Sequence, residues 1–545
     1  MIAARAYELE PAGRRLVFRG ADGTMLAQLS LLSAFDRSDG VDETLAVDVR
    51  HDGATFEIER RSTIWTRAGA TVECRPDSVA VRTWVEGEGR LRDVQLLGGR
   101  SIAPGPTGFF PSGTDARWLF TPNPGDPGRL VLSAGERAVI GVSGDSAPGR
   151  GNWFFTPAPL FFSLDALGIG LVAPVKELTF VQVEYRPSDR GFHLALDYEG
   201  HTYVNGRFEA PAVVLRPAAD PYEGIRLHRR DFAPPRRAAA DAAWWREPIF
   251  CGWGAQCHLA SHDGRRAPDH ATQENYDDFL DALARNDVVP GTVVIDDKWQ
   301  TAYGTNEPDT AKWPDLRAWI AGRHARGQHV LLWWKAWDAE GVDPELCIRT
   351  PDGLPVAIDP TNPRTCELLR RSMYDLLSAD GLDADGLKVD FTARTPSGTA
   401  LSLHGDTWGI ALLHELLEVV YTAAKDAKAD ALLIMQTPHP SFVDVCDMIR
   451  LNDMLRLDDA GAFPAVVPQM RHRAAVAHAA CPELLVDTDD WAVPDKRTWR
   501  EYLELKPELG VPSLYYATHL DVSSEALDDD DYAAVRRTWE RWRAA

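Results

Sequence analysis

Residues 386–391 have the sequence Gly-Leu-Lys-Val-Asp-Phe, a short apolar run interrupted by two charged side chains. At the two-residue period of a β-strand, Lys388 and Asp390 lie on one face and the three apolar residues on the other. We expect the apolar face to pack against an outer layer of helices. The charged face then points inward, where burial costs free energy unless the two groups pair with each other or bind a ligand. The run therefore predicts a buried strand with reactive groups inside.

Similar apolar runs recur through the second half of the chain, separated by segments with apolar residues at helical spacing. Residues 276, 279, 280 and 283 show this spacing, as do residues 413, 416, 417 and 420. Eight strands alternating with helices are typical of a (β/α)8 TIM barrel. Residues 436–447 are too few for a full crossover helix, so we expect a short helix or a 3₁₀ turn there. The eight runs are residues 249–253, 292–295, 329–334, 386–391, 431–435, 448–451, 483–486 and 513–516.

The first part of the chain has a strand pattern and little helical periodicity. Phe56 and Ile58 alternate with Glu57 and Glu59, and turn-forming clusters separate such stretches. This pattern predicts an antiparallel β-sandwich. The fold class is therefore a multidomain β plus α/β protein, with a sandwich at 1–221, a helical linker at 222–246 and the catalytic barrel at 247–545.

Composition and charge narrow the classes of function. The net charge of −23 disfavours nucleic acid and anionic membranes as partners, and it is compatible with a small neutral carbohydrate. No apolar stretch fits a signal peptide or a membrane span, so we expect a soluble cytoplasmic protein and leave homo-oligomerisation open. The seven cysteines are scattered without metal-ligand spacing, which favours reduced thiols over disulfides.

The carboxyl ends of the predicted barrel strands carry acids, bases and tryptophans, and active sites of such barrels lie at these ends. A single aspartate after a strand is commonly a helix N-cap. Seven strand ends with polar groups together favour a binding or catalytic site. Nine of the 18 tryptophans fall between residues 244 and 337, and indole faces stack on sugar rings. The candidate site residues are Trp253, Asp296, Asp297, Trp299, Trp333, Lys335, Trp337, Lys388, Asp390, Arg450, Asp453 and Asp490.

Several of these strand-end motifs, in this order, resemble the α-galactosidase clan, and most closely its raffinose-synthase and seed-imbibition-protein branch. The resemblance spans most of the chain. The motifs are VVIDDKWQ (293–300), HVLLWWKAWDAEGV (329–342), DADGLKVDF (383–391), IRLNDM (449–454) and VDTDDW (486–491), with NWFFTPAPLFF (152–162) in the first region.

This resemblance implies a retaining α-glycosidase, an α-galactosidase first of all, without metal or organic cofactor. It makes Asp390 the nucleophile and Asp453 the general acid/base, with Asp296, Asp297 and Lys388 binding sugar hydroxyls. Lys388 should favour the ionised form of Asp390, whereas an acid such as Asp453 needs a raised pKa. Lys298 and Lys335 depart from the family pattern and add positive charge, which suggests a modified or acidic sugar.

Other interpretations remain open. Asp458 or Asp459 could be the general acid/base instead of Asp453. Transglycosylation, or hydrolysis of a different α-linked sugar, would use the same residues. Lys388 could instead form a Schiff base, as in barrel aldolases. A metal-dependent hydrolase is disfavoured because neither HxH after the first strand nor HExxH is present. A non-catalytic carbohydrate-binding protein is the third class.

Overall fold

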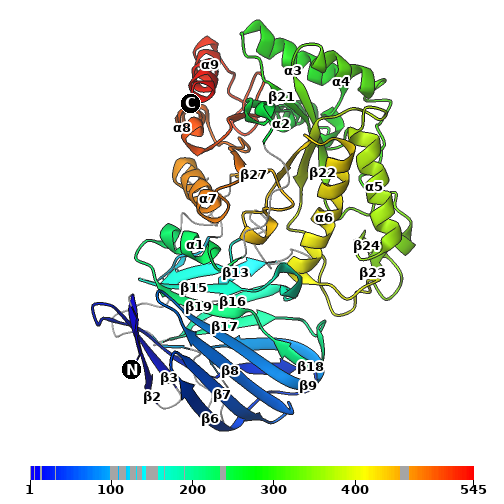
Figure 1. The fold of residues 1–545 in the computed structure, drawn as a ribbon. Coiled ribbons are helices and arrows are strands. Elements are labelled where there is room, and N and C mark those ends of the chain that lie inside the picture. Colours follow the sequence, from blue (N-terminus) through cyan, green and yellow to red (C-terminus); the bar gives the residue numbers. More distant parts are fainter. Residues whose placement is uncertain are drawn as a thin grey trace.

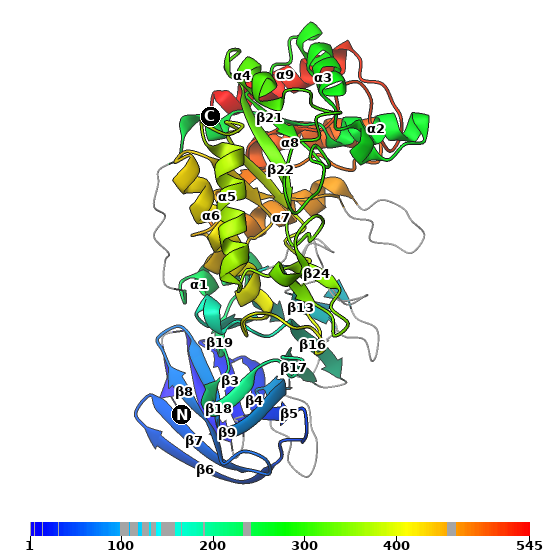
Figure 2. The ribbon, with the colours of Figure 1, turned by 90° about the vertical axis from the view of Figure 1, so that its right-hand side faces the viewer.

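The computed structural model describes most of the chain. It covers residues 2–98 except 5, 13, 14 and 31, then 108–109, 118–122, 130–131, 138–142, 158–232 except 165, 189 and 190, and finally 241–454 and 465–545. An antiparallel β-rich region built by the first half lies below a parallel barrel built by the second half (Figure 1). Figure 2 shows the same two parts after a quarter turn, with α5 (Pro363–Leu377) and α6 (Gly409–Ala427) on the outside of the barrel. No helix in the described ranges is long and apolar enough to cross a membrane.

The N-terminal region confirms the expected strand pattern. Phe56 and Ile58 on β7 are buried while Glu57 and Glu59 are exposed, so the alternation separates a core face from a solvent face. Seventeen strands of the described residues join in one antiparallel network. The strands of the region are β1 (Ile2–Ala3), β2 (Tyr7–Ala12), β3 (Arg15–Gly20), β4 (Met25–Ser30), β5 (Ala34–Arg37), β6 (Thr44–Asp52), β7 (Thr55–Ser62), β8 (Arg67–Cys74), β9 (Val79–Leu96), β10 (Gly108–Phe109), β11 (Trp118–Leu119), β12 (Leu130–Val131), β13 (Ala138–Val142), β14 (Phe161–Leu164), β15 (Leu167–Val172), β16 (Gln182–Ser188), β17 (Gly191–Asp197), β18 (Tyr203–Glu209) and β19 (Ala212–Pro217).

The long strand β9 organises this network, because different parts of it pair with β5, β8, β17, β18 and β19. The antiparallel β-rich character is thus established, and the packing of the strands as a sandwich stays a prediction. The segment 152–162 that resembles the family begins outside the described residues, and its described end lies at β14.

All eight apolar runs of the second half form parallel strands. Their order is β28-β27-β26-β25-β22-β21-β20-β29, and the ends of the sheet approach each other where Asp487 pairs with Val511. The Ser513 hydroxyl also donates to Asp487, and the Ser513 N–H donates to the Thr488 hydroxyl at 3.0 Å, so the barrel is nearly closed. The strands are β20 (Ile249–Cys251), β21 (Thr292–Ile295), β22 (His329–Lys335), β25 (Gly386–Asp390), β26 (Leu432–Met435), β27 (Met448–Arg450), β28 (Leu485–Asp487) and β29 (Ser513–Leu514).

Helices cover the outside of the barrel, and local sequence sets where they begin. Thr272 caps α3 by accepting from the Asn275 N–H at 3.3 Å, and Asp528 closes a capping box on α9. The short crossing between β26 and β27 contains the expected 3₁₀ turn, η5 (Pro440–Phe442). The helices are α1 (Pro221–Arg229), α2 (Trp253–Asp263), α3 (Gln273–Arg285), α4 (Leu316–His324), α5 (Pro363–Leu377), α6 (Gly409–Ala427), α7 (Val466–Ala480), α8 (Lys496–Leu509) and α9 (Asp529–Arg543). The shorter elements are the 3₁₀ turns η1 (Val175–Glu177), η2 (Ala243–Arg246), η3 (Ala267–His270) and η4 (Pro344–Leu346) and the hairpin strands β23 (Cys347–Arg349) and β24 (Pro355–Ile358).

Helix α1 and the start of α6 are two of the places where the β-rich region meets the barrel. Helix α1 packs on β14, β15 and β19 on one side and on α7 on the other (Figure 1), where the Tyr222 hydroxyl lies 2.9 Å from His472 Nδ1. At the start of α6, Gly409 has φ of +64°, and a Cβ there would lie 2.2 Å from the Phe180 carbonyl oxygen. Only glycine fits both the left-handed backbone and this close approach.

Candidate active site

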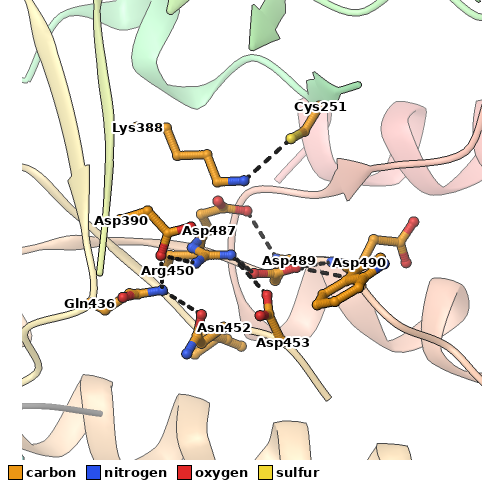
Figure 3. Close-up of polar contacts among 12 residues, drawn as sticks. Cys251, Lys388, Asp390, Gln436, Arg450, Asn452, Asp453, Asp487, Asp489 and Asp490 are labelled. Atoms are coloured by element: carbon orange, nitrogen blue, oxygen red, sulfur yellow. Dashed lines mark hydrogen bonds and ion pairs between the residues drawn. The ribbon is translucent and has the colours of Figure 1, made fainter. Parts of the chain in front are cut away.

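The carboxyl ends of four barrel strands bring a cluster of charged residues together. Asp296 follows β21, Asp390 ends β25, Arg450 ends β27, Asp453 follows it, and Asp489 follows β28. Because these strands run parallel in one sheet, their carboxyl ends lie at the same end of the barrel. Figure 3 shows the carboxylates of β25, β27 and β28 converging on Arg450.

Arg450 is the centre of this cluster and is only 2% exposed. Its Nη2 lies 3.1 Å from Asp390 Oδ1, and its Nη1 lies 3.1 Å from Asp453 Oδ1 and 2.7 Å from Asp489 Oδ2. One planar guanidinium thus binds three carboxylates from three strand ends, an arrangement that the fork of arginine donors suits. Asp390 and Asp453 remain 17% and 16% exposed, whereas Asp489 is fully buried. Of the three, the first two carboxylates are therefore the ones that a ligand can reach.

The surroundings of Asp390 favour its ionised form. Burial raises the pKa of its carboxyl, but the Arg450 and Lys388 charges and three N–H donors outweigh burial, so the pKa is lowered. The donors are the Phe391 N–H at 2.8 Å, the Trp333 indole N–H at 3.1 Å and the Gln436 amide at 3.1 Å. Arg450 contributes more to this shift than Lys388, the residue that the sequence pointed to.

Asp453 is in the opposite electrostatic situation. Burial, followed by the nearby negative charges of Asp489 and Asp390, raises the pKa of its carboxyl to about 7 in spite of the contact with Arg450. Two carboxyl groups bound to the same guanidinium thus have pKa values moved in opposite directions. Such a divergence is the usual sign of an acid and an ionised partner in one site.

Lys388 pairs with Asp296, the residue after β21, rather than with Asp390. The Lys388 ammonium lies 2.6 Å from Asp296 Oδ2, and both side chains are 3% exposed. The Cys251 thiol donates to the same Asp296 oxygen at 3.0 Å. In Figure 3 the Lys388 ammonium points toward Cys251, whose sulfur lies 3.4 Å away. Burial lowers the Lys388 pKa, but the Asp296 charge more than reverses this effect, so the pKa is raised.

Asp297, Lys298 and Lys335 gather around Tyr303, which the sequence did not indicate. The Tyr303 hydroxyl donates to Asp297 at 2.7 Å, and burial raises the pKa of that carboxyl to about 6. The ammonium groups of Lys298 and Lys335 lie 3.8 and 3.9 Å from the centre of the Tyr303 ring. Each lysine also has its own carboxylate partner, since Lys298 is 2.5 Å from Glu340 and Lys335 is 2.7 Å from Asp338. These partners neutralise the additional positive charge.

The strand-end tryptophans differ in burial. Trp253 is half-buried, with its ring 5.8 Å from that of Trp491. Trp299 is fully buried and donates to the Trp333 carbonyl at 2.8 Å, while Trp337 is 3% exposed and donates to the Thr392 carbonyl at 3.3 Å. Since Trp299 and Trp337 present no free ring face to a sugar, we do not carry them into the proposed site. Trp333 is also buried, and it contacts the site through its bond to Asp390.

Asp490 points away from Arg450, toward α8. It is fully buried, its Oδ1 lies 2.6 Å from the Lys506 ammonium, and its Oδ2 accepts from the Trp499 indole and the Tyr515 N–H at 3.2 Å each. Both oxygens are therefore occupied by the protein, and Asp490 is also not carried into the proposed site. The two rivals of Asp453, Asp458 and Asp459, lie outside the described residues.

Strained backbone marks the same strand ends. Among the described non-glycine residues with positive φ, five lie one to three residues beyond barrel strands, namely Lys298, Trp337, Phe391, Asn452 and Asp489, with φ between 54° and 73°. A left-handed conformation costs free energy in such residues and concentrates at functional sites. The strain therefore supports a functional role for this end of the barrel.

Four residues of the site were not among the candidates predicted from the sequence. They are Tyr303, Gln436, Asn452 and Asp489. The Gln436 amide donates to Asp390 and to the Asn452 side chain, which links the ends of β25, β26 and β27. Gln436, Asn452 and Asp489 stand at the ends of apolar runs in the sequence, but the strand-end rule alone did not single them out as site residues. Tyr303 lies eight residues beyond β21 and gave no signal of that kind.

Neither a protein-family model nor a curated protein matches the sequence. Solved structures do match the fold. A GH31 family sulfoquinovosidase from E. rectale, in complex with an aza-sugar inhibitor, has a TM-score of 0.59 at 12% identity, over 99% of this chain and 82% of that one. An α-galactosidase from Thermus thermophilus in complex with stachyose has a TM-score of 0.54 at 14% identity, over 90% of this chain and 99% of that one.

A GH36 α-galactosidase from Geobacillus stearothermophilus in complex with raffinose has a TM-score of 0.51 at 13% identity, over 100% of this chain and 76% of that one. At such low identities the likeness concerns the fold. Over nearly its whole length, this chain therefore shares with those proteins an antiparallel β-rich region followed by a nearly closed eight-stranded parallel barrel.

Proposed function

We propose that this protein is a glycoside hydrolase, specifically a retaining α-glycosidase of α-galactosides that works by double displacement through Asp390 and Asp453. The observation that carries the proposal is the pair of carboxyl groups on Arg450. Both are reachable from solvent, one has a lowered pKa and the other a pKa of about 7. The similarity to solved α-galactosidases and to a sulfoquinovosidase supports the hydrolase class and the clan resemblance.

In the first step, an oxygen of the ionised Asp390 bonds to the anomeric carbon while the bond from that carbon to the leaving oxygen breaks. Asp453 gives its proton to the leaving oxygen. In the second step, Asp453 takes a proton from water as the water oxygen bonds to the anomeric carbon. Asp390 leaves as a carboxylate, and net retention results from the two inversions.

Other parts of the site fit the binding of one sugar ring. Asp297 is half-buried at this end of the barrel and offers a carboxylate oxygen to sugar hydroxyls, and Trp253 has a partly free ring. Lys388 is 3% exposed and paired with Asp296, so we expect it to act through that partner. Asp296 is bound by Lys388, Cys251 and the Asp297 N–H, so we expect it to act mainly by orienting its neighbours. The raised pKa of Lys388 disfavours a Schiff base, which requires a neutral amine.

Chemical rescue tests the proposal. Asp390→Gly should abolish the hydrolysis of an aryl α-galactoside, and added azide should restore turnover with a β-galactosyl azide product, because azide fills the space of the nucleophile. Asp490→Asn is the matched control, since Asp490 lies nearby but faces Lys506, and azide should not alter its rate. Unchanged hydrolysis by Asp390→Gly would refute the assignment, and binding without turnover by the wild type would favour a non-catalytic carbohydrate-binding protein.

A substrate panel tests the sugar. We expect an aryl α-galactoside to react faster than the α-glucoside and the α-sulfoquinovoside, because the carboxylate partners of Lys298 and Lys335 leave little net positive charge for an anionic sugar. Product analysis with an acceptor sugar present separates hydrolysis from transglycosylation. Faster reaction of the anionic substrate would refute the preference for galactose while leaving the mechanism in place.

A further inference from the structure

Asp489 is the third carboxylate that binds Arg450, and the surrounding protein encloses it and hydrogen-bonds to it. Its side chain is fully buried. Its Oδ1 accepts from the N–H groups of Asp490 at 2.6 Å and Trp491 at 3.1 Å, and its own N–H donates to Asp487 at 3.0 Å. The backbone at Asp489 is left-handed, with φ of +54°. Being closed off from solvent, Asp489 acts through its neighbours rather than on a substrate.

Those neighbours include the proposed acid. The Arg450 Nη1 group is shared between Asp489 at 2.7 Å and Asp453 at 3.1 Å, so Asp489 has the shorter contact (Figure 3). Among the described residues, Asp390 and Lys388 also act on Asp453, and Cys257 and Arg473 are affected by it. The Arg473 Nη1 donates to the Asp453 carbonyl at 2.7 Å.

We propose that Asp489 is a positioning residue that favours the protonated form of Asp453, both by holding the Arg450 guanidinium and by placing a negative charge beside Asp453. The inference rests on the proposed function, in which Asp453 must give a proton to the leaving oxygen. Without the Asp489 charge, the like-charge repulsion disappears and Arg450 becomes free to bind Asp453 more strongly. Both changes favour ionised Asp453, so the direction of the effect is unambiguous.

The test is the pH dependence of kcat/KM in Asp489→Asn, measured with a substrate whose leaving group is a poor one and needs the proton. In this pH profile, the fall of kcat/KM at high pH, the basic limb, reports loss of the Asp453 proton. We expect this limb to move toward acid by about one pH unit, which is about a tenfold loss of kcat/KM above the limb. With an activated leaving group, such as a dinitrophenyl ether, the limb should be absent in both proteins.

Asp447→Asn is the matched control, because Asp447 is equally buried and ion-paired, 2.8 Å from Lys425, but precedes β27 instead of following it. It should lose stability without any shift of the basic limb. Asp489→Glu keeps the charge and should keep the limb near its wild-type position, even where kcat falls. A basic limb in Asp489→Asn that coincides with the wild-type limb would overturn the proposal.

Two further measurements keep the test decisive. Asp489→Ser removes the charge and leaves room for water, so it replaces Asp489→Asn if circular dichroism shows that the latter is unfolded, and the same shift is expected. In the wild type, a basic limb below pH 5 with the poor leaving group would also overturn the inference. Failure of the proposed function is distinguishable, because Asp390→Gly would then retain activity whatever the behaviour of Asp489→Asn.

Discussion

Replacing Arg450 by Gln should raise the pKa of Asp390 and destabilise the fold at neutral pH. The guanidinium contacts three carboxyl groups at 3.1, 3.1 and 2.7 Å and is 2% exposed, so the change leaves the clustered charges of Asp390 and Asp489 without their shared cation. Lys388 cannot take over, because its ammonium is bound to Asp296 at 2.6 Å. We therefore expect Asp390 to lose most of the interaction that keeps it ionised.

The structure gives the size of the effect. At an effective dielectric constant near 20, the contacts with Asp390 and Asp489 each correspond to about 5–6 kcal/mol of attraction before desolvation. Breaking a buried ion pair by removing one partner typically costs about 3–5 kcal/mol of unfolding free energy. Loss of an adjacent opposite charge raises a carboxyl pKa by about 1–3 units. The stability loss should be largest near pH 7 and shrink as the pH falls toward 4, because protonation removes the unpaired charges.

The assay is kcat/KM against pH with an activated aryl α-galactoside, which needs the ionised nucleophile but no acid. The acid limb should move upward by about 1–3 pH units in Arg450→Gln. Arg216→Gln is the matched control, because Arg216 is also a buried arginine, 2.9 Å from Asp231 but in the β-rich region, and its acid limb should not move. An acid limb in Arg450→Gln at the wild-type pH would refute the role assigned to the guanidinium.

Two further predictions concern stability. The Asp453 pKa of about 7 lies above the unfolded value of about 3.9, so the wild type loses stability as the pH rises between these values. In urea denaturation, Asp453→Asn should then be roughly 2–4 kcal/mol more stable than wild type at pH 8 and equally stable at pH 4. Equal stability of the two proteins at both pH values would contradict the raised pKa. Lys388→Met should cost about 3–5 kcal/mol, because it leaves Asp296 buried without its cation. Lys298→Met should lower the free energy of unfolding by less than about 1 kcal/mol, since its partner Glu340 is 48% exposed. Similar shifts of the melting temperature in the two lysine variants would be inconsistent with this difference.

Local patterns in the sequence were sufficient to predict much of the fold. The two-residue period of β7, the eight apolar runs of the barrel and the 3₁₀ turn at Pro440–Phe442 all agree with the structure. Each depends on neighbouring residues, through side-chain alternation, helical spacing or the length of a connection. The strand-end rule likewise brought Asp390, Arg450 and Asp453 to one end of the barrel, because parallel strands point the same way.

What the tertiary structure decided is which of these groups touch. Lys388 and Asp390 share a strand face, yet Lys388 binds Asp296, 92 residues earlier in the chain, because strand register and barrel closure bring β21 and β25 within reach. Trp253 and Trp299 both follow strands, but packing leaves only the first partly open. The opposite pKa shifts of Asp390 and Asp453 also depend on distances to Arg450 and Asp489. The sequence alone therefore determined the strands and the end of the barrel where the chemistry is proposed, and three-dimensional proximity determined the electrostatic role of each carboxylate.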